Sequence, residues 1–352
     1  MPNDDVFAEL DLTLQDAEKQ PELYRATSFW RAASLRIADE LKASGIENFR
    51  RIKSALGYFV PNFGPPTNSF SVEHVESLMQ HARHELKVSD KTLRTLDQYL
   101  SGYFHARSDY RVLKASDTQD KKPFLHDFSE SEFGRPVEQF EFDGKRFSRS
   151  SLNYLLGLSM LKQQVDTGSI RTVLEIGGGF GTLGEILAQS GLPQVRYIDV
   201  DIPPTQFVAA QYLSHVLGRD RVAGYSDTRD RTIDIAGLPT ATVLCNWQIE
   251  QLKGHVDLFV NFISFQEMEP HVVRNYLHHV DRLQARWILL RNMREGKQKR
   301  TATSHGVETP ILSDDYIRML GHYKLIARNV HPFGFETADG FNSELLLLER
   351  GG

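Results

Sequence analysis

Residues 173–183 read VLEIGGGFGTL, an apolar run followed by glycines at positions 177, 178, 179 and 181. The apolar run predicts a short buried strand, and the segment GTLGEILAQS that follows predicts a helix. Glycine lets the backbone turn sharply and come close to a ligand, and the first turn of a helix presents unpaired N–H groups. The stretch therefore predicts a strand–turn–helix unit with a ligand site at the carboxyl end of the strand.

Strands and helices alternate from about residue 170 to the end of the chain, which predicts a parallel sheet with helices on both faces. Helices are expected over 181–190, 204–218 and 270–283. The seven expected strands are 171–177, 194–201, 241–246, 256–264, 286–292, 323–330 and 342–350. The last two flank a Gly/Pro loop and predict a terminal antiparallel pair. The predicted fold class is α/β, with a Rossmann-like sheet of seven strands.

The first part of the chain shows mainly helical periodicity. Helices are predicted over 28–46, 71–88, 89–104 and 150–165, and Asp143-Gly144 between alternating residues predicts a type I′ hairpin. We therefore expect two units, a mostly helical cap over 1–166 and a ligand-binding domain over 167–352. From its position and aromatic content, the cap is predicted to form much of the acceptor pocket.

Composition excludes several classes of function. The 352 residues hold 41 Lys+Arg and 46 Asp+Glu without a long block of like charge, which argues against a nucleic-acid or anionic-membrane partner. The single cysteine, Cys245, cannot form an internal disulfide or a thiolate metal site, so a reducing, cytoplasmic location is expected. We see no export signal and no membrane span. The histidine pairs at 81/84 and 278/279 lack a third ligand at a recognised spacing, so no metal is predicted.

The glycine loop alone leaves the cofactor open, because Gly179–Gly184 also fits the dinucleotide pattern G-x-G-x-x-G, and a loop with no ligand is a further alternative. Glu175 starts the pattern E-x-G-x-G-x-G, and an antiparallel pair closes the unit; both favour S-adenosylmethionine. About 20 residues on, Asp199 and Asp201 lie at a strand end, where a carboxylate accepts hydrogen bonds from ribose hydroxyls. We favour Asp201, because Pro203 marks the turn just after it.

Two further segments complete the predicted site. Asn246 and Trp247 follow the third strand and are expected to bind the edge and the face of adenine, although a tryptophan in this place is as often part of the core. The polar residues after the fourth strand are expected closest to the transferred carbon. They are Asn261, Ser264, Phe265, Gln266, Glu267 and His271.

The segments VLEIGGGFGTLGEIL, YIDVDIPPTQFVA, VDLFVNFISFQEMEP, LLRNMREGK, PILSDDYIRML and GFNSELLLLER together resemble a bacterial family of sugar O-methyltransferases, which are class I S-adenosylmethionine-dependent enzymes. The resemblance runs from about residue 140 to the end. It implies a methyltransferase sheet, S-adenosylmethionine as cofactor, and a sugar or natural-product hydroxyl as acceptor. Asn246 departs from the proline that many relatives have there. The azetidine-2-carboxylate synthases, which cyclise S-adenosylmethionine itself, are similar too.

An alcohol acceptor must lose a proton as it attacks, so a general base is expected. The candidates are His271 and Glu267, with Ser264 beside them and His305 as third choice. Arg291, Arg294 and Glu295 follow the fifth strand and are candidates to bind a polar acceptor. A cyclase would instead need an aromatic wall that stabilises a sulfonium, and the cap offers Tyr103, Phe104, Tyr110, Phe140, Phe142, Phe147 and Tyr154 for it or for its own core. A degenerate fold that only binds small molecules is the third alternative.

Overall fold

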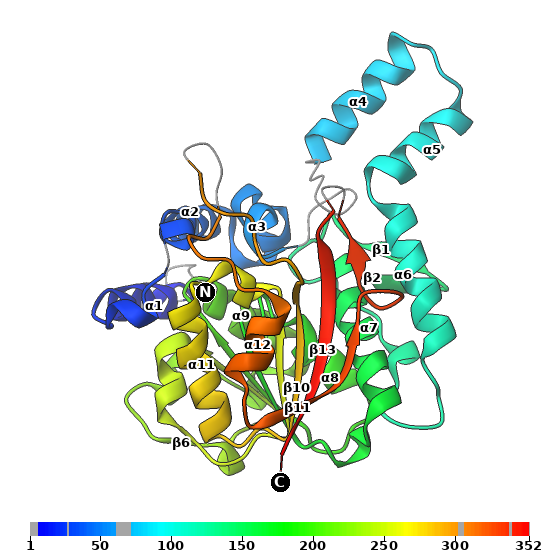
Figure 1. Ribbon diagram of the computed structural model, residues 1–352. Helices are drawn as coiled ribbons and strands as arrows, with labels where there is room; N and C mark the ends of the chain where they lie inside the picture. Colours follow the sequence, from blue (N-terminus) through cyan, green and yellow to red (C-terminus); the bar gives the residue numbers. More distant parts are fainter. Residues whose placement is uncertain (1–5, 27, 61–71, 302–305, 338–339, 352) are drawn as a thin grey trace.

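A mixed sheet lies between two layers of helices, and an arm of two helices projects from this body (Figure 1). The computed structural model describes residues 6–26, 28–60, 72–301, 306–337 and 340–351. Among these residues, no helix is both long enough and apolar enough to cross a membrane.

The main sheet has the strand order β11-β13-β10-β9-β3-β4-β7-β5, with β12 paired to β13. Six neighbouring strands, from β10 to β5, are parallel, and β13 lies antiparallel between β10 and β11. The strands are β3 (Thr172–Ile176), β4 (Arg196–Asp201), β5 (Val222–Ala223), β7 (Ala241–Cys245), β9 (Leu258–Phe262), β10 (Trp287–Met293), β11 (Tyr323–Asn329), β12 (Phe335–Glu336) and β13 (Asn342–Arg350). Two short strands, β6 (Ile233–Asp234) and β8 (Leu252–Lys253), form a separate pair.

All seven predicted strands form, and the terminal antiparallel pair is confirmed. The sheet nevertheless has nine strands rather than seven, because the two-residue strands β5 and β12 add to its edge and to β13. Segments this short carry no periodic pattern that a sequence could show. The α/β, Rossmann-like fold class is confirmed.

Both faces of the sheet are covered, and the side chains of each strand alternate between two cores. Val173 and Val260 pack on one side with α7 (Arg149–Gln164), α8 (Thr182–Gln189) and α9 (Thr205–Leu217). Leu174 and Phe259 pack on the other side with α11 (Pro270–Arg282) and α12 (Ser313–Met319). Strands β3, β7 and β9 are buried throughout, as the continuous apolar runs predicted.

The cap contains more helices than the sequence indicated. It consists of α1 (Ala8–Glu18), α2 (Ser28–Ser44), α3 (Lys53–Tyr58), α4 (Val72–His84), α5 (Asp90–Leu100), α6 (Tyr103–Ser116) and the hairpin of β1 (Phe140–Phe142) and β2 (Lys145–Phe147). The hairpin turn has positive φ at both Asp143 and Gly144, as a type I′ turn requires. The predicted helix 89–104 is broken, because Gly102 (φ +81°) ends α5 and starts α6.

The cap and the sheet share one hydrophobic core. Phe49 and Ile37 of the cap belong to the same buried cluster as Val173 of the sheet. Helix α7 lies on the cap side of the predicted boundary at residues 166/167, yet it packs directly on the sheet: a Cβ on Gly157 would lie 2.5 Å from the ring of Phe262. The cap therefore forms a fixed wall over the carboxyl ends of the strands.

Candidate active site

The glycine loop joins β3 to α8, and three of its glycines adopt positive φ: Gly177, Gly179 and Gly181. A Cβ on Gly177 would lie 2.2 Å from Oγ of Ser264, and one on Gly178 would lie 2.6 Å from Oδ1 of Asp199, so both must be glycine for packing reasons. Gly179 differs, because the nearest atom to its Cβ position is 3.6 Å away. The loop is therefore packed from below and open at Gly179.

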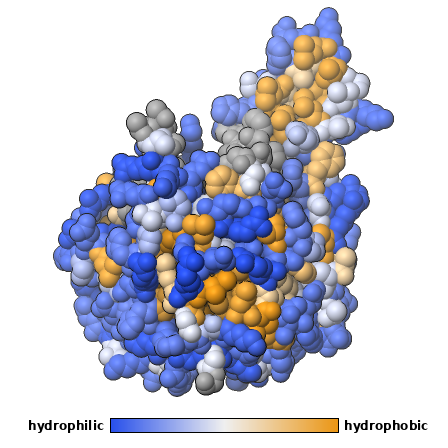
Figure 2. Space-filling model, viewed as in Figure 1, coloured by the Kyte–Doolittle hydropathy of each residue, from blue (hydrophilic) through white to orange (hydrophobic). Residues whose placement is uncertain are grey.

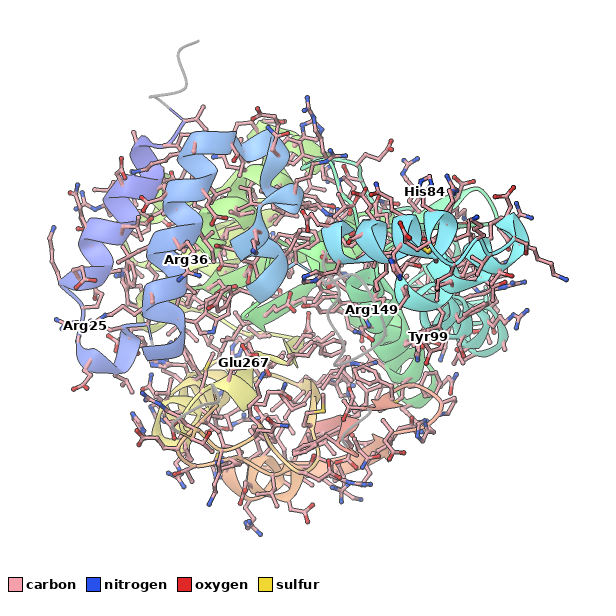
Figure 3. All side chains as sticks on the ribbon, turned by 90° about the horizontal axis from the view of Figure 1, so that it is seen from above. Arg25, Arg36, His84, Tyr99, Arg149 and Glu267 are labelled. Atoms are coloured by element: carbon pink, nitrogen blue, oxygen red, sulfur yellow. The ribbon has the colours of Figure 1, made fainter. Side chains whose placement is uncertain are left out.

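A cavity of about 1150 Å³, counting its open mouth, lies above this loop. Seven predicted site residues line it: Gly177, Gly178, Gly179, Asp201, Asn246, Ser264 and Glu267. The remaining wall comes from Phe180, Thr182, Ile202, Thr205, Phe262, Ile263, Met268, Val272 and Tyr276 on the sheet side, and from Leu23, Arg25, Ala26, Trp30, Tyr58, Phe59, Ser150, Asn153 and Tyr154 on the cap side. Figure 3 shows Glu267 near the middle of the molecule, next to the cap helices.

Three carboxylates lie around the loop: Glu175 and Asp199 are fully buried, and Asp201 is partly exposed. Glu175 accepts hydrogen bonds from the hydroxyls of Tyr154 (2.6 Å) and Tyr197 (2.5 Å). Asp199 accepts one from the Gly178 N–H (3.2 Å), and its other oxygen, Oδ2, has no hydrogen-bond partner in the described chain. Asp201 accepts from the backbone N–H groups of Gly179 (3.1 Å) and Ile202 (2.7 Å). Glu175 and Asp199 thus support the loop from below, and Asp201 reaches the cavity.

Burial raises the pKa of all three carboxyls: to about 7 for Glu175, to about 7 for Asp201, and well above its usual value for Asp199. The charge of Asp201 also raises the pKa of Glu175 and of Asp199, Glu175 raises that of Asp199, and Glu267 raises that of Asp201. In the described part of the chain, no lysine, arginine or histidine forms an ion pair with any of them. Uncompensated buried negative charge is costly, so this end of the cavity favours a cationic ligand.

Asn246 is held in one orientation by the segment before α2. Its Nδ2 donates to the carbonyl of Tyr24 (2.7 Å) and to the hydroxyl of Tyr276 (3.2 Å). A carbonyl can only accept, so the amide nitrogen must face Tyr24. The Oδ1 atom is buried without a partner among the described groups, as is the hydroxyl of Thr205, another cavity residue. Buried acceptors normally have a donor, so Asn246 fits a ligand that carries an N–H group.

Tyr24 fastens this segment to the sheet side of the cavity. Its hydroxyl donates to Glu250 (2.7 Å), accepts from Asn275 (3.0 Å) and lies 3.2 Å from Nε2 of His279. Its neighbours Leu23, Arg25 and Ala26 line the cavity. The sequence gave no signal for this anchor.

Glu267 is the second carboxylate in the cavity wall. It lies in the short turn after β9 and forms an ion pair with Lys297 (2.9 Å). Ser264, in the same turn, donates to the carbonyl of Ile176 (3.0 Å) and receives a hydrogen bond from Asn261 (2.6 Å). Arg25 is the one Lys, Arg or His among the described lining residues. The acidic character therefore extends from the loop to the middle of the cavity.

Several predicted residues lie outside the cavity lining. His271 is exposed in the first turn of α11. Trp247 packs edge-on against Tyr225 in the core, with ring centroids 5.8 Å apart. Asn261 is buried and hydrogen-bonds the backbone of Ile176, and Gln266 is buried and hydrogen-bonds the backbone of Met293. Phe265 belongs to the core. Gly181 is the residue at which α8 begins. His305 lies outside the described residues.

The charged residues that we predicted to bind the acceptor make contacts outside the cavity. Arg291 is fully buried, donates to the carbonyls of Asn153 (3.1 Å) and Phe333 (2.7 Å), and does not line the cavity. Arg294 pairs with Glu295, which holds Asn342. Most of the predicted aromatic wall forms a cluster around the β1–β2 hairpin, and only Tyr154 of that set lines the cavity.

Other aromatic residues form the aromatic part of the cavity wall. Trp30 and Tyr58 of the cap, with ring centroids 5.3 Å apart, line the cavity together with Phe59, and Tyr154 stacks on Phe262 at 4.8 Å. The sequence signal for them was slight: Tyr58 and Phe59 begin an aromatic, proline-rich loop. No group of three or more His, Cys, Asp or Glu suited to a metal ion occurs within the ranges described.

No family model matches the sequence, and no curated protein matches it. Among solved structures, magnesium protoporphyrin IX methyltransferase from Synechocystis with bound S-adenosylmethionine is 14% identical over 81% of this chain and 100% of its own (TM-score 0.38). An O-methyltransferase from Bacillus cereus with S-adenosylhomocysteine is 15% identical over 78% and 100% (0.36). TomG from Streptomyces achromogenes, an O-methyltransferase of tomaymycin synthesis, is 13% identical over 57% and 79% (0.35). Because identities and TM-scores are low, the fold assignment rests on this chain's own strand order.

Proposed function

We propose that this protein is an S-adenosylmethionine-dependent methyltransferase. The observation that carries the proposal is a set of three carboxylates around the glycine loop without a basic partner: the buried Glu175 and Asp199, and the partly exposed Asp201. A dinucleotide would bring a pyrophosphate to these negative charges. A sulfonium cofactor brings positive charge instead, which lowers the cost of ionising them.

The residues fit the parts of this cofactor. Asp201 reaches the cavity and offers a carboxylate to ribose hydroxyls, and the unpaired Oδ1 of Asn246 offers an acceptor for the adenine amine. The open face of Gly179 leaves room for the backbone to approach the amino-acid part. The bound cofactor supplies an electrophilic methyl group, so the protein needs mainly to align an acceptor and exclude water.

Glu267 is our candidate general base for a hydroxyl acceptor. It lies in the cavity wall, whereas His271 is exposed outside it. The ion pair with Lys297 fixes the direction of the Glu267 carboxylate. In this proposal Glu267 would take the hydroxyl proton while the acceptor oxygen bonds to the methyl carbon, the carbon–sulfur bond breaks and S-adenosylhomocysteine leaves. A sugar or natural-product hydroxyl, which the family resemblance implies, is the proposed acceptor.

A second candidate function is supported by the aromatic part of the wall. Trp30, Tyr58 and Phe59 face a cavity with acidic residues, and such a combination stabilises cations. In a cyclase, the amino nitrogen of S-adenosylmethionine would displace methylthioadenosine and give azetidine-2-carboxylate. This reaction needs no acceptor.

The purified protein should be incubated with S-adenosylmethionine alone and the products analysed by mass spectrometry. Methylthioadenosine with azetidine-2-carboxylate would establish the cyclase. Bound, intact cofactor would support the methyltransferase, and a panel of sugar and natural-product alcohols would then be scored for S-adenosylhomocysteine. Glu267→Gln should lower that rate by about 10²–10⁴-fold with cofactor affinity retained. Binding without turnover on every acceptor would favour the degenerate fold, and no binding at all would contradict both enzymatic proposals.

A further inference from the structure

The helical arm, residues 72–104, exposes an apolar surface that the rest of the molecule does not cover. Four of the eight large hydrophobic side chains that are exposed in the described chain lie on it: Leu78 (45% exposed), Leu86 (63%), Tyr99 (61%) and Phe104 (41%). Figure 2 shows apolar residues gathered along the arm, which stands out from the body. An apolar surface of this kind usually marks an interaction site.

The arm's own packing does not account for these residues. Within the helical hairpin, Val75 and Ala82 of α4 and Leu93 and Leu100 of α5 are already buried. The exposed side chains are therefore not among the buried residues through which α4 and α5 pack on each other. A two-helix hairpin with apolar residues left over can bury them only against another element.

The charges on the arm favour a second copy of the same arm. Five acidic and four basic residues nearly cancel over 72–104, which disfavours a polyanion or an anionic membrane as partner. On α4 the signs are separated along the helix: Glu73 and Glu76 lie near its start, and His81, Arg83 and His84 in its last turn. In an antiparallel pair of α4 helices, the acidic start of each faces the basic end of the other.

We propose that two copies of this chain associate through their arms, with α4 antiparallel to α4 of the second copy. The two hairpins then form an antiparallel four-helix bundle, the usual arrangement for helices of this kind. Seen from above, His84 and Tyr99 on the arm lie well to one side of Glu267 (Figure 3). The pairing therefore leaves the cavity of each copy accessible, and it is independent of the proposed reaction.

The molar mass in solution tests the association, by sedimentation or light scattering across a range of protein concentrations. The wild-type chain should be a dimer. Leu78→Lys should weaken the dimer about tenfold or more, because an apolar contact becomes a buried charge. Leu312→Lys is the matched control: Leu312 is similarly exposed (49%) but lies next to α12, outside the arm. Both variants should keep the wild-type circular dichroism spectrum, which would show that they fold. A monomeric wild type, or equal weakening by both variants, would overturn the proposal.

Disulfide formation tests the antiparallel arrangement, and the chain is well suited to it because its one cysteine, Cys245, is buried. In an antiparallel pair only residues near the middle of α4 meet their own copies. Leu78→Cys, in the middle of α4 and on its proposed contact face, should therefore form a covalent dimer under mild oxidation. Lys87→Cys, beyond its end, should not. Crosslinking of both variants would show a parallel pair, and crosslinking of neither would exclude α4 from the interface; either result overturns the proposal.

Discussion

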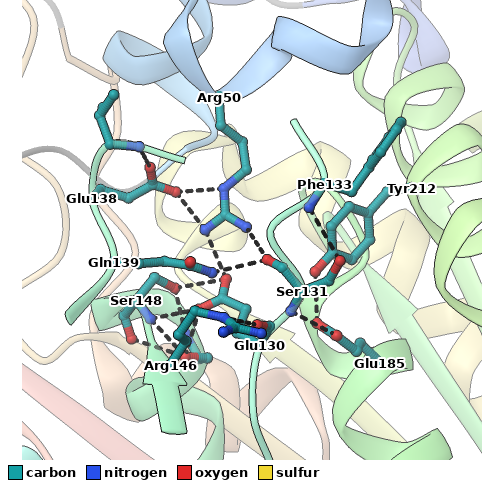
Figure 4. A network of polar contacts seen from close by, with 12 residues as sticks. Arg50, Glu130, Ser131, Phe133, Glu138, Gln139, Arg146, Ser148, Glu185 and Tyr212 are labelled. Atoms are coloured by element: carbon teal, nitrogen blue, oxygen red, sulfur yellow. Dashed lines mark hydrogen bonds and ion pairs between the residues drawn. The ribbon is translucent and has the colours of Figure 1, made fainter. Parts of the chain in front are cut away.

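Two groups of carboxylates lie close to the glycine loop, and they differ in whether a cation accompanies them. Around Arg50, the guanidinium donates to Glu138 (2.6 Å) and Glu130 (2.8 Å), and Glu130 also accepts from Ser148 and Ser151 (Figure 4). At the cavity, Glu175, Asp199 and Asp201 have hydrogen bonds but no cation. The first group has a cation within the fold, one guanidinium for its two carboxylates, whereas the second has none.

Arg50 also contacts Phe180, a residue of the cavity wall. The guanidinium carbon lies 4.8 Å from the ring centroid of Phe180, which is part of the glycine loop. Burial lowers the pKa of Arg50, but Glu130 and Glu138 more than offset this and raise it above its usual value. Arg50 therefore stays charged and connects the cap, the segment before α7 and the loop. This comparison predicts different responses when a charge is removed from each group.

The largest effect is expected for Arg50→Met, which leaves Glu130 and Glu138 buried without their cation. The free energy of unfolding, measured by urea denaturation, should fall by about 3–5 kcal/mol. Arg146→Met is the control. Arg146 is partly exposed and lies 3.6 Å from exposed Glu132, so its loss should cost under about 1 kcal/mol. Equal losses in the two variants would show that the Arg50 group does not depend on its charge.

Gly179→Val should abolish cofactor binding, with a loss of affinity above about 100-fold, because a side chain would fill the open face of the loop. The positive φ of Gly179 also adds strain of about 1–2 kcal/mol to the folded state. Gly144→Val carries similar strain at φ +73° in the β1–β2 hairpin, far from the cavity. Calorimetric titration should show normal affinity for this control. Retained affinity in Gly179→Val would contradict our placement of the cofactor.

Asp201→Asn should lower cofactor affinity but change stability little. Cofactor affinity should fall about tenfold with the loss of the charged acceptor. In the ligand-free protein at pH 8, removal of an uncompensated charge stabilises the fold. The two oxygens of Asp201 accept from the N–H groups of Gly179 and Ile202, however, and an amide has only one acceptor oxygen, so one of these hydrogen bonds is lost. The two effects oppose each other, and the free energy of unfolding should change by less than about 1 kcal/mol. Thermal melting with and without cofactor measures both. A loss of about 3–5 kcal/mol, as expected for Arg50→Met, would show that the cavity carboxylates contribute to the fold as the Arg50 group does.

The sequence predicted this site where a pattern is local. The glycine loop, the seven longer strands and the place of Asp201 at a strand end could be predicted, because each depends on residues that are close together in the sequence. Tyr24 and Trp30 reach the cavity only through the packing of the cap on the sheet, a long-range contact without a local pattern. His271 was favoured because it follows a polar segment, but the turn of α11 directs it to solvent.

The sequence also did not show which of the carboxylates have a cation beside them. Only the fold brings Arg50 to Glu130 and not to Glu175. The prediction of an acidic residue for ribose did not reveal that three carboxylates share the loop without a cation. That feature, more than the glycine motif, distinguishes a cationic cofactor from a dinucleotide.

The smallest predicted effect is the pH dependence of the two groups' contributions. Burial raises the pKa of Glu175 and that of Asp201 to about 7 in the folded, ligand-free protein. Because these values exceed those of the unfolded chain, the folded state binds protons more tightly. The stability of the ligand-free protein should therefore decline as pH rises from about 5 to about 8.

A bound cation lowers the free-energy cost of ionising Glu175 and Asp201, since it lowers the pKa of the carboxyls beside it. Cofactor affinity should consequently rise several-fold between pH 6 and pH 8, and binding near pH 7 should release protons. Calorimetric titration in two buffers of different ionisation enthalpy measures that release directly. Asp201→Asn should show a flatter pH profile than wild type, while Asp220→Asn, an exposed substitution on the surface, should keep the wild-type profile. Proton uptake, or an affinity that falls with pH, would mean that the ligand balances no negative charge in this cavity, and the contrast with the Arg50 group would be lost.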